Sequence, residues 1–264
     1  MRTRSYCVLL PSRFLVFLTG AVLAVAAEAD EKPGYIDTPM LPDSEWRVHD
    51  RERPQPPSVT PGATAADPPS DAIVLFDGTN LDAWEGGTAE AIEDGAFNIV
   101  KTSGLTTKQK FGDCQLHIEW ATPAEADGDA MNWGNSGIFF QGLYELQVIE
   151  SRACHIYADG IAGSIYGQVP PLVNPCREPG QWQSFDAVFL APKFEGDQLV
   201  EPARMTVFYN GVLVLYHAKV LGATRHKTLP SYSVPAETGP LVLQQHHSAV
   251  RFRNIWVRPL TLDQ

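Results

Sequence analysis

The chain has 264 residues, of which 31 are acidic and 20 are basic, so its formal net charge is −11. Such an acidic chain repels phosphate backbones, which argues against nucleic acid as a partner. The same balance is compatible with neutral substrates and with divalent cations held by carboxylates, and charge alone does not choose between them.

Residues 1–27 predict a secretory signal peptide. Arg2, Arg4 and Arg13 precede an apolar run over 14–27, and small residues suit a cleavage site near Ala27. The alternative is an uncleaved anchor, but the run is shorter than the roughly 18–20 residues that a membrane span needs. We therefore expect a secreted or periplasmic protein without a membrane span after cleavage. The loss of three arginines would leave a net charge of −14.

Residues 28–72 differ in composition from the rest of the chain. They contain nine of the 21 prolines and show neither a helical nor a strand period. Proline removes hydrogen-bond donors and favours extended backbone, so this segment is predicted to be a linker or an extended strap. The stretch from Asp37 to Pro42, with Trp46 and Val48, is more apolar than a free linker needs. We expect that part to pack along the surface of the domain.

From residue 73 onward the pattern is that of short β-strands separated by turn residues. Asn210-Gly211 is a hairpin signal, because both residues readily adopt positive φ. No segment keeps a helical period over three turns, and no internal repeat is present. Residues 73–262 are thus predicted to form one all-β domain, a sandwich or a closed barrel. The predicted strands are 73–76, 97–100, 114–120, 137–141, 144–149, 185–190, 205–209, 212–216, 241–245 and 252–257.

Three cysteines remain once Cys7 has left with the signal peptide. An odd number in an oxidising compartment suggests one disulfide and one free thiol. Cys154 and Cys176 bracket a loop-rich segment and are the predicted pair, whereas Cys114 lies within a strand pattern, where a free thiol behaves as a small hydrophobe. No cysteine or histidine cluster has zinc-binding spacing.

The first candidate site lies on the predicted strand 144–149. Alternation places Glu145 and Gln147 on the face opposite Tyr144, so the two polar side chains project in parallel, roughly 6–7 Å apart at the backbone. That spacing suits binding of sugar hydroxyls or bracketing of a reacting carbon. Directly upstream, Asn135 belongs to a polar, glycine-interrupted loop of the kind that often carries binding groups.

Further polar side chains occur on other predicted strands. Glu119 lies on the face opposite Leu116, Arg253 points opposite Phe252, and His246 follows a strand. A single glutamate is more often ordinary surface charge and a single histidine more often structural. A functional role follows only if these groups converge on one concave face, and histidine is the residue most easily tuned for acid–base work near neutral pH.

The glycine-rich loop 159–167 lacks phosphate-binding spacing, and Tyr166 within it is a candidate stacking or hydrogen-bonding wall of a cleft. The chain contains neither the G-x-S-x-G nucleophile motif nor the His-Glu-x-x-His zinc motif. These absences argue against a serine-hydrolase elbow and against a zinc-protease site.

A set of motifs spread over about residues 73–260 resembles the family of 3-keto-disaccharide hydrolase domain proteins. The resemblance implies a concanavalin A-like lectin/glucanase jelly roll, a sandwich of two antiparallel sheets, and cleavage of glycosides oxidised at C3. Departures are Cys154 and Cys176 in loops, and Gln245 where the family often has an acidic residue. The matching stretches are 75–81 with Trp84, 111–113, 134–138, 144–148, 157–160, 162–163, 166–168, 171–174, 180–182, 210–212 and 253–257.

The chemistry that this resemblance implies needs a base and a group that stabilises an enolate, because a C3 ketone acidifies the proton on C2. Glu145 or His246 is the expected base. Glu119, Gln147 and Arg253 are expected to position the carbohydrate substrate or a divalent cation. No cofactor is certain, and Glu119, Glu145 and His246 are the possible metal ligands.

Three alternatives stay open. The chain could be a non-catalytic carbohydrate-binding module, since the same fold serves many lectins. It could be an ordinary glycoside hydrolase, which in its retaining form needs two carboxylates about 5–5.5 Å apart. Acidity and the proline-rich segment alone would also fit a structural surface protein.

Overall fold

A computed structural model of the chain describes residues 32–126, 128–233 and 237–262. The predicted signal peptide lies outside these residues and stays a prediction. Contacts within the chain separate two compact units at the Pro57–Ser58 junction. No helix in the described ranges is long and apolar enough to cross a membrane.

The first unit, described from residue 32 to Pro57, is a small turn-rich structure. A parallel bridge joins Tyr35 to Asp50, and an antiparallel bridge joins Met40 to Arg47. The Arg47 guanidinium donates to the Thr38 carbonyl at 2.7 Å. Hydrogen bonds within this proline-rich segment therefore give it a local fold of its own.

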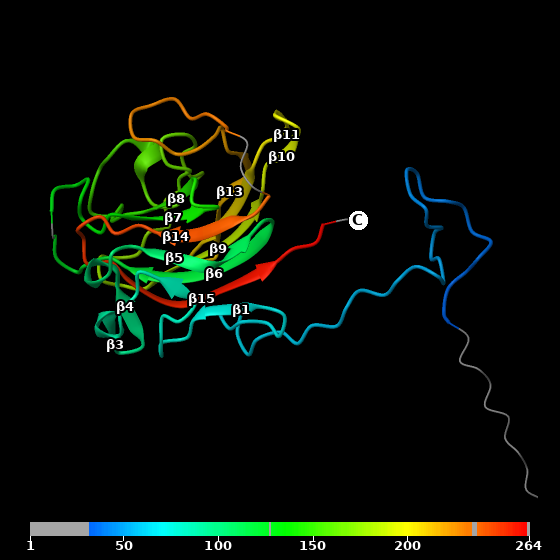
Figure 1. The fold of residues 1–264 in the computed structure, drawn as a ribbon, viewed down its shortest axis with the longest axis horizontal. Helices are drawn as coiled ribbons and strands as arrows, with labels where there is room; N and C mark the ends of the chain where they lie inside the picture. The colour runs from blue at the N-terminus through cyan, green and yellow to red at the C-terminus, as the bar shows by residue number, and fades with distance from the viewer. Residues whose placement is uncertain (1–31, 127, 234–236, 263–264) are drawn as a thin grey trace, which may run out of the picture. The chain divides into compact units, whose positions relative to one another are not determined.

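The second unit, Ser58–Gln264, is built on two antiparallel sheets, which confirms the predicted all-β sandwich (Figure 1). A 3-10 turn occurs at η1 (Ala89–Ala91), η2 (Ile99–Lys101) and η3 (Ala158–Gly160). The larger sheet runs β13 (Val212–Lys219), β12 (Arg204–Tyr209), β9 (Gln183–Leu190), β6 (Cys114–Ala121), β15 (Arg251–Pro259), β4 (Ala96–Asn98) and β3 (Ile92–Glu93), with β1 (Ile73–Phe76) also paired to β15. The smaller sheet runs β2 (Trp84–Glu85), β5 (Leu105–Phe111), β14 (Gly239–Leu243), β7 (Ser136–Phe140) and β8 (Tyr144–Val148).

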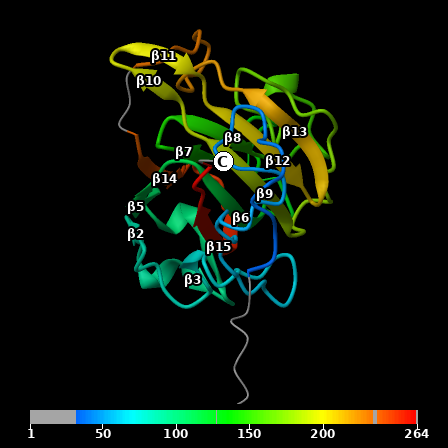
Figure 2. The same cartoon turned by 90° about the vertical axis from the view of Figure 1, so that its right-hand side faces the viewer.

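A further hairpin, β10 (Lys193–Glu195) with β11 (Gln198–Glu201), projects at one end of this unit (Figure 2). The Asn210-Gly211 turn joins β12 to β13, as the sequence predicts, and Asn210 has a φ of 51°. The hairpin turn therefore has the positive φ that this dipeptide tolerates.

The core lies between the two sheets, because one face of each strand is apolar. On β9, Phe185, Ala187 and Phe189 are buried while the intervening residues are only half-buried. On β8, Tyr144 and Leu146 face the core, and Tyr144 stacks on Phe189 across the sandwich with 5.8 Å between ring centroids. The alternation therefore turns the other side chains of β8 toward the outer face of the smaller sheet.

By their contacts, residues 58–72 cluster with the sandwich unit, which spans Ser58–Gln264. The Ala66 carbonyl accepts hydrogen bonds from Asn254 at 3.0 Å and from the Trp256 indole at 2.9 Å. Arg258 forms an ion pair with Asp71 at 2.5 Å. This segment is consequently fixed along β15 of the larger sheet.

The predicted disulfide is absent from the structure, where Cys114, Cys154 and Cys176 are free thiols. Cys176 is buried and donates to the carbonyl of Arg177 at 3.4 Å, whereas Cys154 is half-exposed. Burial raises the pKa of Cys114 to about 12, so this thiol is inert, as expected of a cysteine within a strand. Bracketing of a loop by two cysteines was therefore an insufficient basis for pairing them.

Candidate functional site

A pocket of about 510 Å³ lies on the outer face of the smaller sheet. It combines a single carboxylate with amides, two tyrosines, two histidines, one arginine and one lysine. Its lining residues are Met131, Asn132, Asn135, Phe139, Glu145, Gln147, Tyr157, Tyr166, Thr224, Arg225, His226, Lys227, Gln244 and His246.

The floor of the pocket comes from β7 and β8. Glu145 and Gln147 alternate with core residues on β8, and their side chains are only 5% and 1% exposed. Gly137 on β7 lies opposite Gln147, and a Cβ at this position would collide with the carboxylate of Glu145. Glycine at 137 therefore leaves the space that the Glu145 carboxylate occupies.

Two loops complete the edge of β8 and so bring their side chains to the pocket. The Tyr166 amide donates to the Glu145 carbonyl at 3.2 Å, and the Gln147 amide donates to Ser164 at 3.0 Å. On the same strand, the Glu145 amide donates to the Thr224 hydroxyl at 3.1 Å. These hydrogen bonds pair the open backbone groups of edge strand β8, and they hold both loops beside Glu145.

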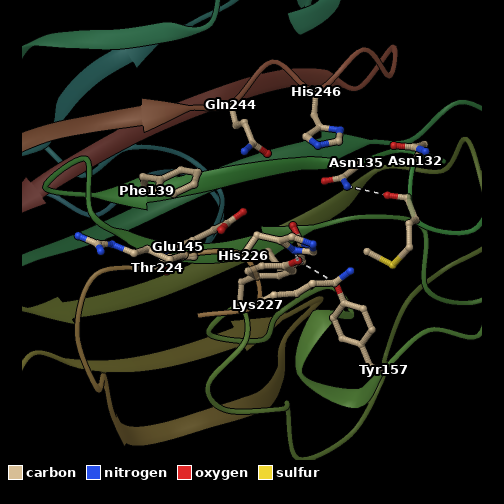
Figure 3. Close-up of a pocket in the computed structure, with 14 residues that line it drawn as sticks. Asn132, Asn135, Phe139, Glu145, Tyr157, Thr224, His226, Lys227, Gln244 and His246 are labelled. Atoms are coloured by element: carbon tan, nitrogen blue, oxygen red, sulfur yellow. Dashed lines mark hydrogen bonds between the residues drawn. The ribbon is translucent and has the colours of Figure 1, made fainter. Parts of the chain in front are cut away.

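Glu145 is the most strongly perturbed group of the pocket. Burial raises the pKa of its carboxyl to about 8, because desolvation disfavours the charged form. No described residue forms an ion pair with its carboxylate. Figure 3 shows Glu145 pointing into the space between Gln244 and His226. A carboxyl with a pKa near neutral pH, open to a pocket, is suited to proton transfer.

Tyr166 forms the second chemically notable group. Its hydroxyl is 2.7 Å from the Tyr157 hydroxyl and 2.8 Å from Nδ1 of His226. Burial, then the hydrogen bond with Tyr157 and the nearby charges of Glu145 and Asp159, raise the pKa of Tyr166 above its usual value. Tyr166 therefore keeps its proton over the physiological range and is connected to the protein surface through exposed His226 and Tyr157.

His246 follows β14 and faces the same pocket, above Asn135 in Figure 3. Its Nδ1 atom is buried and has no hydrogen-bond partner among the described residues. Asn135 is held in place because its side-chain amide donates to the Met131 carbonyl at 2.6 Å. Both side chains thus present polar atoms to a bound molecule.

Residues 71–258 match the family described as the 3-keto-alpha-glucoside-1,2-lyase-like domain, a match that covers most of the chain. The chain belongs to this family. Membership confirms the resemblance found in the sequence and places the chain among carbohydrate-active proteins. No protein of curated function matches the chain.

Solved structures of the same fold come from Parabacteroides distasonis ATCC 8503. One proposed glycosyl hydrolase is 41% identical, with a TM-score of 0.75 over 81% of this chain and 97% of that one. A second is 19% identical, with a TM-score of 0.53 over 72% of this chain and 94% of that one, and shows the fold alone. The family member described here therefore has the predicted concanavalin A-like jelly roll.

The structure brings together five of the seven predicted catalytic and substrate-binding residues, which are Glu145, His246, Asn135, Gln147 and Tyr166. Glu119 and Arg253 are elsewhere, in a cleft of about 340 Å³ on the outer face of the larger sheet. These groups therefore do not all converge on one face, because β6 and β15 belong to the other sheet.

The possible metal set of Glu119, Glu145 and His246 is divided between the two faces for the same reason. Within the described residues, no group of three or more histidine, cysteine, aspartate or glutamate side chains could hold a metal ion. The predicted ligands therefore do not form a common site.

Glu119 and Arg253 belong instead to a charged network around buried His117. Glu119 accepts from Arg253 at 2.7 Å and from Asn254 at 3.0 Å, and His117 Nδ1 lies 2.7 Å from Asp186. Burial alone would lower the pKa of His117, but its hydrogen bond to Asp186 and the Glu119 carboxylate, 3.7 Å from Nε2, raise it to about 9. The nearby His117 ring lowers the pKa of Glu119 to about 2 against the effect of burial, with help from Asn254 and Arg253.

We expect Glu119→Gln to lower the free energy of unfolding by about 1–3 kcal/mol at pH 6, because it leaves His117 and Arg253 without their carboxylate. The difference from wild type should vanish as the pH falls from 4.5 through 2, where Glu119 itself becomes protonated. The His117 contribution should fade as the pH rises from 6.5 through 9.

Urea unfolding at several pH values measures both effects. The control is Glu93→Gln, which removes an exposed ion pair with Lys101 and should change stability little. Turnover of any substrate should change less than twofold in Glu119→Gln, since Glu119 lies outside the pocket. A large loss of turnover at unchanged stability would contradict this assignment.

Asn132 lies in the same polar loop as Asn135, and eight further lining residues escaped the sequence analysis. For most of them no pattern was available, because they lie on loops. The exception is the run Thr224-Arg225-His226-Lys227, three basic residues in succession within an acidic chain, which could have been singled out. The missed residues are Met131, Phe139, Tyr157, Thr224, Arg225, His226, Lys227 and Gln244.

Proposed function

We propose that the pocket cleaves 3-keto-glycosides by elimination across C1 and C2 of the oxidised sugar. The observation that carries this proposal is Glu145, a desolvated carboxyl whose pKa of about 8 makes it a stronger base than an ordinary carboxylate. Membership of a 3-keto-alpha-glucoside-1,2-lyase-like family supports the substrate and the bond. The predicted secretion would place this activity outside the cytoplasm.

The steps balance without an external oxidant. Glu145 takes the proton from C2, which the C3 ketone has acidified, and the electron pair forms an enolate. The enolate then collapses, the C1–O bond breaks, and a double bond forms between C1 and C2. The departing oxygen takes a proton and leaves as an alcohol. Later addition of water to the unsaturated sugar would make the overall result a hydrolysis.

Tyr166 is the proposed acid for the departing oxygen. Its raised pKa keeps the hydroxyl protonated, and the hydrogen bonds with Tyr157 and His226 allow the proton to be replaced from the surface. Asn135, Gln147 and His246 supply polar groups for the sugar hydroxyls and for the C3 oxygen. Glu145 as base and Tyr166 as acid are close enough for the charge of one to shift the pKa of the other.

The pocket gives less support to an ordinary retaining glycoside hydrolase. That mechanism uses a pair of carboxylates about 5–5.5 Å apart. Among the described lining residues Glu145 is the one carboxylate, and its neighbour on the same strand face is the amide of Gln147. Elimination needs a single base and therefore fits this lining better.

A panel of matched disaccharides, unoxidised and oxidised at C3, tests the proposal. We expect the protein to cleave only the 3-keto compounds, and Glu145→Gln to lose that activity. A chelator added to parallel reactions shows whether a divalent cation contributes. Cleavage of the unoxidised sugars at a similar rate would contradict the proposal, and binding without cleavage of either set would identify a carbohydrate-binding module instead.

A further inference from the structure

We propose that Arg225 and Lys227 form a carboxylate-binding subsite at the mouth of the pocket, which selects glycosides whose leaving group carries a carboxylate. This inference rests on the proposed function for the identity of the bond cleaved. It adds the chemical class of the leaving group, which neither the family nor the catalytic residues specify.

The first observation is the charge of the pocket. The chain as a whole has a net charge of −11, yet the described lining contains Arg225, Lys227 and two histidines against the single carboxyl of Glu145. Burial raises the pKa of that carboxyl to about 8, so it carries little negative charge at neutral pH. The mouth of the pocket is thus a cationic region on an acidic protein, and it would attract anions.

The second observation is that these two cations are available to bind an anion. Both are exposed, and neither has a hydrogen bond or an ion pair within the described part of the chain. By contrast, two other basic residues on this unit are held by carboxylates, Lys193 by Glu201 and Arg258 by Asp71. The nearby acid Asp159 acts on Tyr166 and is not part of the lining.

The third observation is that the segment carrying these cations is anchored at its start. Thr224 donates from its amide to the Leu143 carbonyl at 2.9 Å and accepts from the Glu145 amide at 3.1 Å. Ala223 pairs with Ser231 across the base of the loop. Figure 3 shows Lys227 below Glu145, on the same side as His226. The cations therefore extend from a fixed point beside the catalytic carboxyl.

The position of the cations indicates which part of the substrate they bind. Glu145 is buried, so the oxidised ring that gives up its C2 proton must lie deep in the pocket. Arg225 and Lys227 are exposed at the mouth, where the leaving group would lie. Neutral sugars gain little from two free cations, whereas a carboxylate gains charge-assisted hydrogen bonds, in the bidentate geometry that suits arginine.

Two substrates that differ in one charge test this proposal: the 3-keto derivatives of α-glucosylglycerate and of α-glucosylglycerol. We expect wild type to have the higher kcat/KM on the glycerate compound. The ratio of kcat/KM on the glycerate compound to kcat/KM on the glycerol compound should fall about tenfold in Arg225→Gln or Lys227→Gln. This is the effect expected for the loss of one charge-assisted contact. Lys227→Arg should largely retain the ratio, and added salt should reduce it in wild type.

The matched control is Lys219→Gln, which removes an exposed cation of the larger sheet and should leave the ratio unchanged. If the ratio is unchanged in Arg225→Gln and Lys227→Gln, the subsite proposal is overturned. This holds even if kcat/KM falls equally on both compounds, because an equal fall would mean that the cations act on the reacting ring and not on the leaving group. If neither compound is cleaved, the proposed function fails. Binding of unoxidised α-glucosylglycerate to Glu145→Gln, with and without Lys227→Gln, then tests the subsite separately: equal affinity of the two proteins also overturns it.

Discussion

Replacing Glu145 with Gln should reduce kcat on a 3-keto-glycoside by about 10²–10⁴-fold, the range typical of a lost general base. Glutamine keeps the shape of the side chain and its fit beside Gly137 but cannot accept the C2 proton. In wild type, activity should increase with pH and level off above about 8, because only the deprotonated carboxylate acts as base. Initial rates from pH 5 to 10 measure both effects.

The same substitution should stabilise the fold at alkaline pH. The folded pKa of Glu145 is about 8 and lies above the usual 4.5, so the folded state binds the proton more tightly than the unfolded state. Wild type therefore loses stability as the pH rises from 4.5 to 8, whereas Glu145→Gln does not. We compare the free energy of unfolding of the variant minus that of wild type at the two pH values. This difference should be at least about 1.4 kcal/mol larger at pH 9 than at pH 4, the equivalent of one pKa unit.

Thermal unfolding at pH 4 and pH 9 checks this gain. Glu237→Gln is a suitable control, because that carboxyl is exposed and lies outside the pocket. A variant that is inactive and equally destabilised at both pH values would show that Glu145 is structural. An active variant would remove Glu145 from the mechanism altogether.

Replacing Tyr166 with Phe should lower kcat by about 10²–10³-fold on glycosides of ordinary alcohols, since the departing alkoxide then lacks its proton donor. The loss should be much smaller on 3-keto-glycosides of 4-nitrophenol, because that leaving group departs without protonation. The phenyl ring preserves the stacking of Tyr166 on His226, whose ring centroid lies 6.4 Å away. Comparison of Tyr166→Phe with wild type therefore measures the contribution of the Tyr166 hydroxyl alone.

Tyr157→Phe is the matched control for this experiment. Its hydroxyl contacts that of Tyr166 at 2.7 Å and lies at the exposed end of the relay. We expect a loss of less than about tenfold, with the same dependence on the leaving group, as for a residue that positions the acid. Equal losses on both classes of leaving group in Tyr166→Phe would instead indicate that Tyr166 binds the sugar ring.

The fold was largely predictable because strand alternation and turn residues are local signals. The period-two pattern over 144–149 placed Glu145 and Gln147 on one face, and the structure confirms that both leave the core for the pocket. Alternation reports the face of one strand but not the sheet to which that strand belongs. Glu119 was therefore grouped with Glu145, although β6 and β8 lie in different sheets.

The loops of the site were less predictable for a related physical reason. Tyr166 and Thr224 reach Glu145 because their segments satisfy the open edge of β8 through hydrogen bonds between positions distant in the chain. No local pattern encodes such long-range pairing. The pKa of Glu145 is likewise a consequence of its burial in the folded chain, and it could not be inferred from the isolated strand.

The most direct test of the elimination mechanism follows the hydrogen on C2. A 3-keto-glycoside deuterated at C2 should be cleaved more slowly than the unlabelled compound. The first product should be a 1,2-unsaturated 3-keto sugar that lacks the deuterium. Wild type and Glu145→Gln are compared by single-turnover kinetics and mass spectrometry. Retention of the C2 deuterium in the released sugar, with no isotope effect on cleavage, would contradict the proposed role of Glu145 as the base.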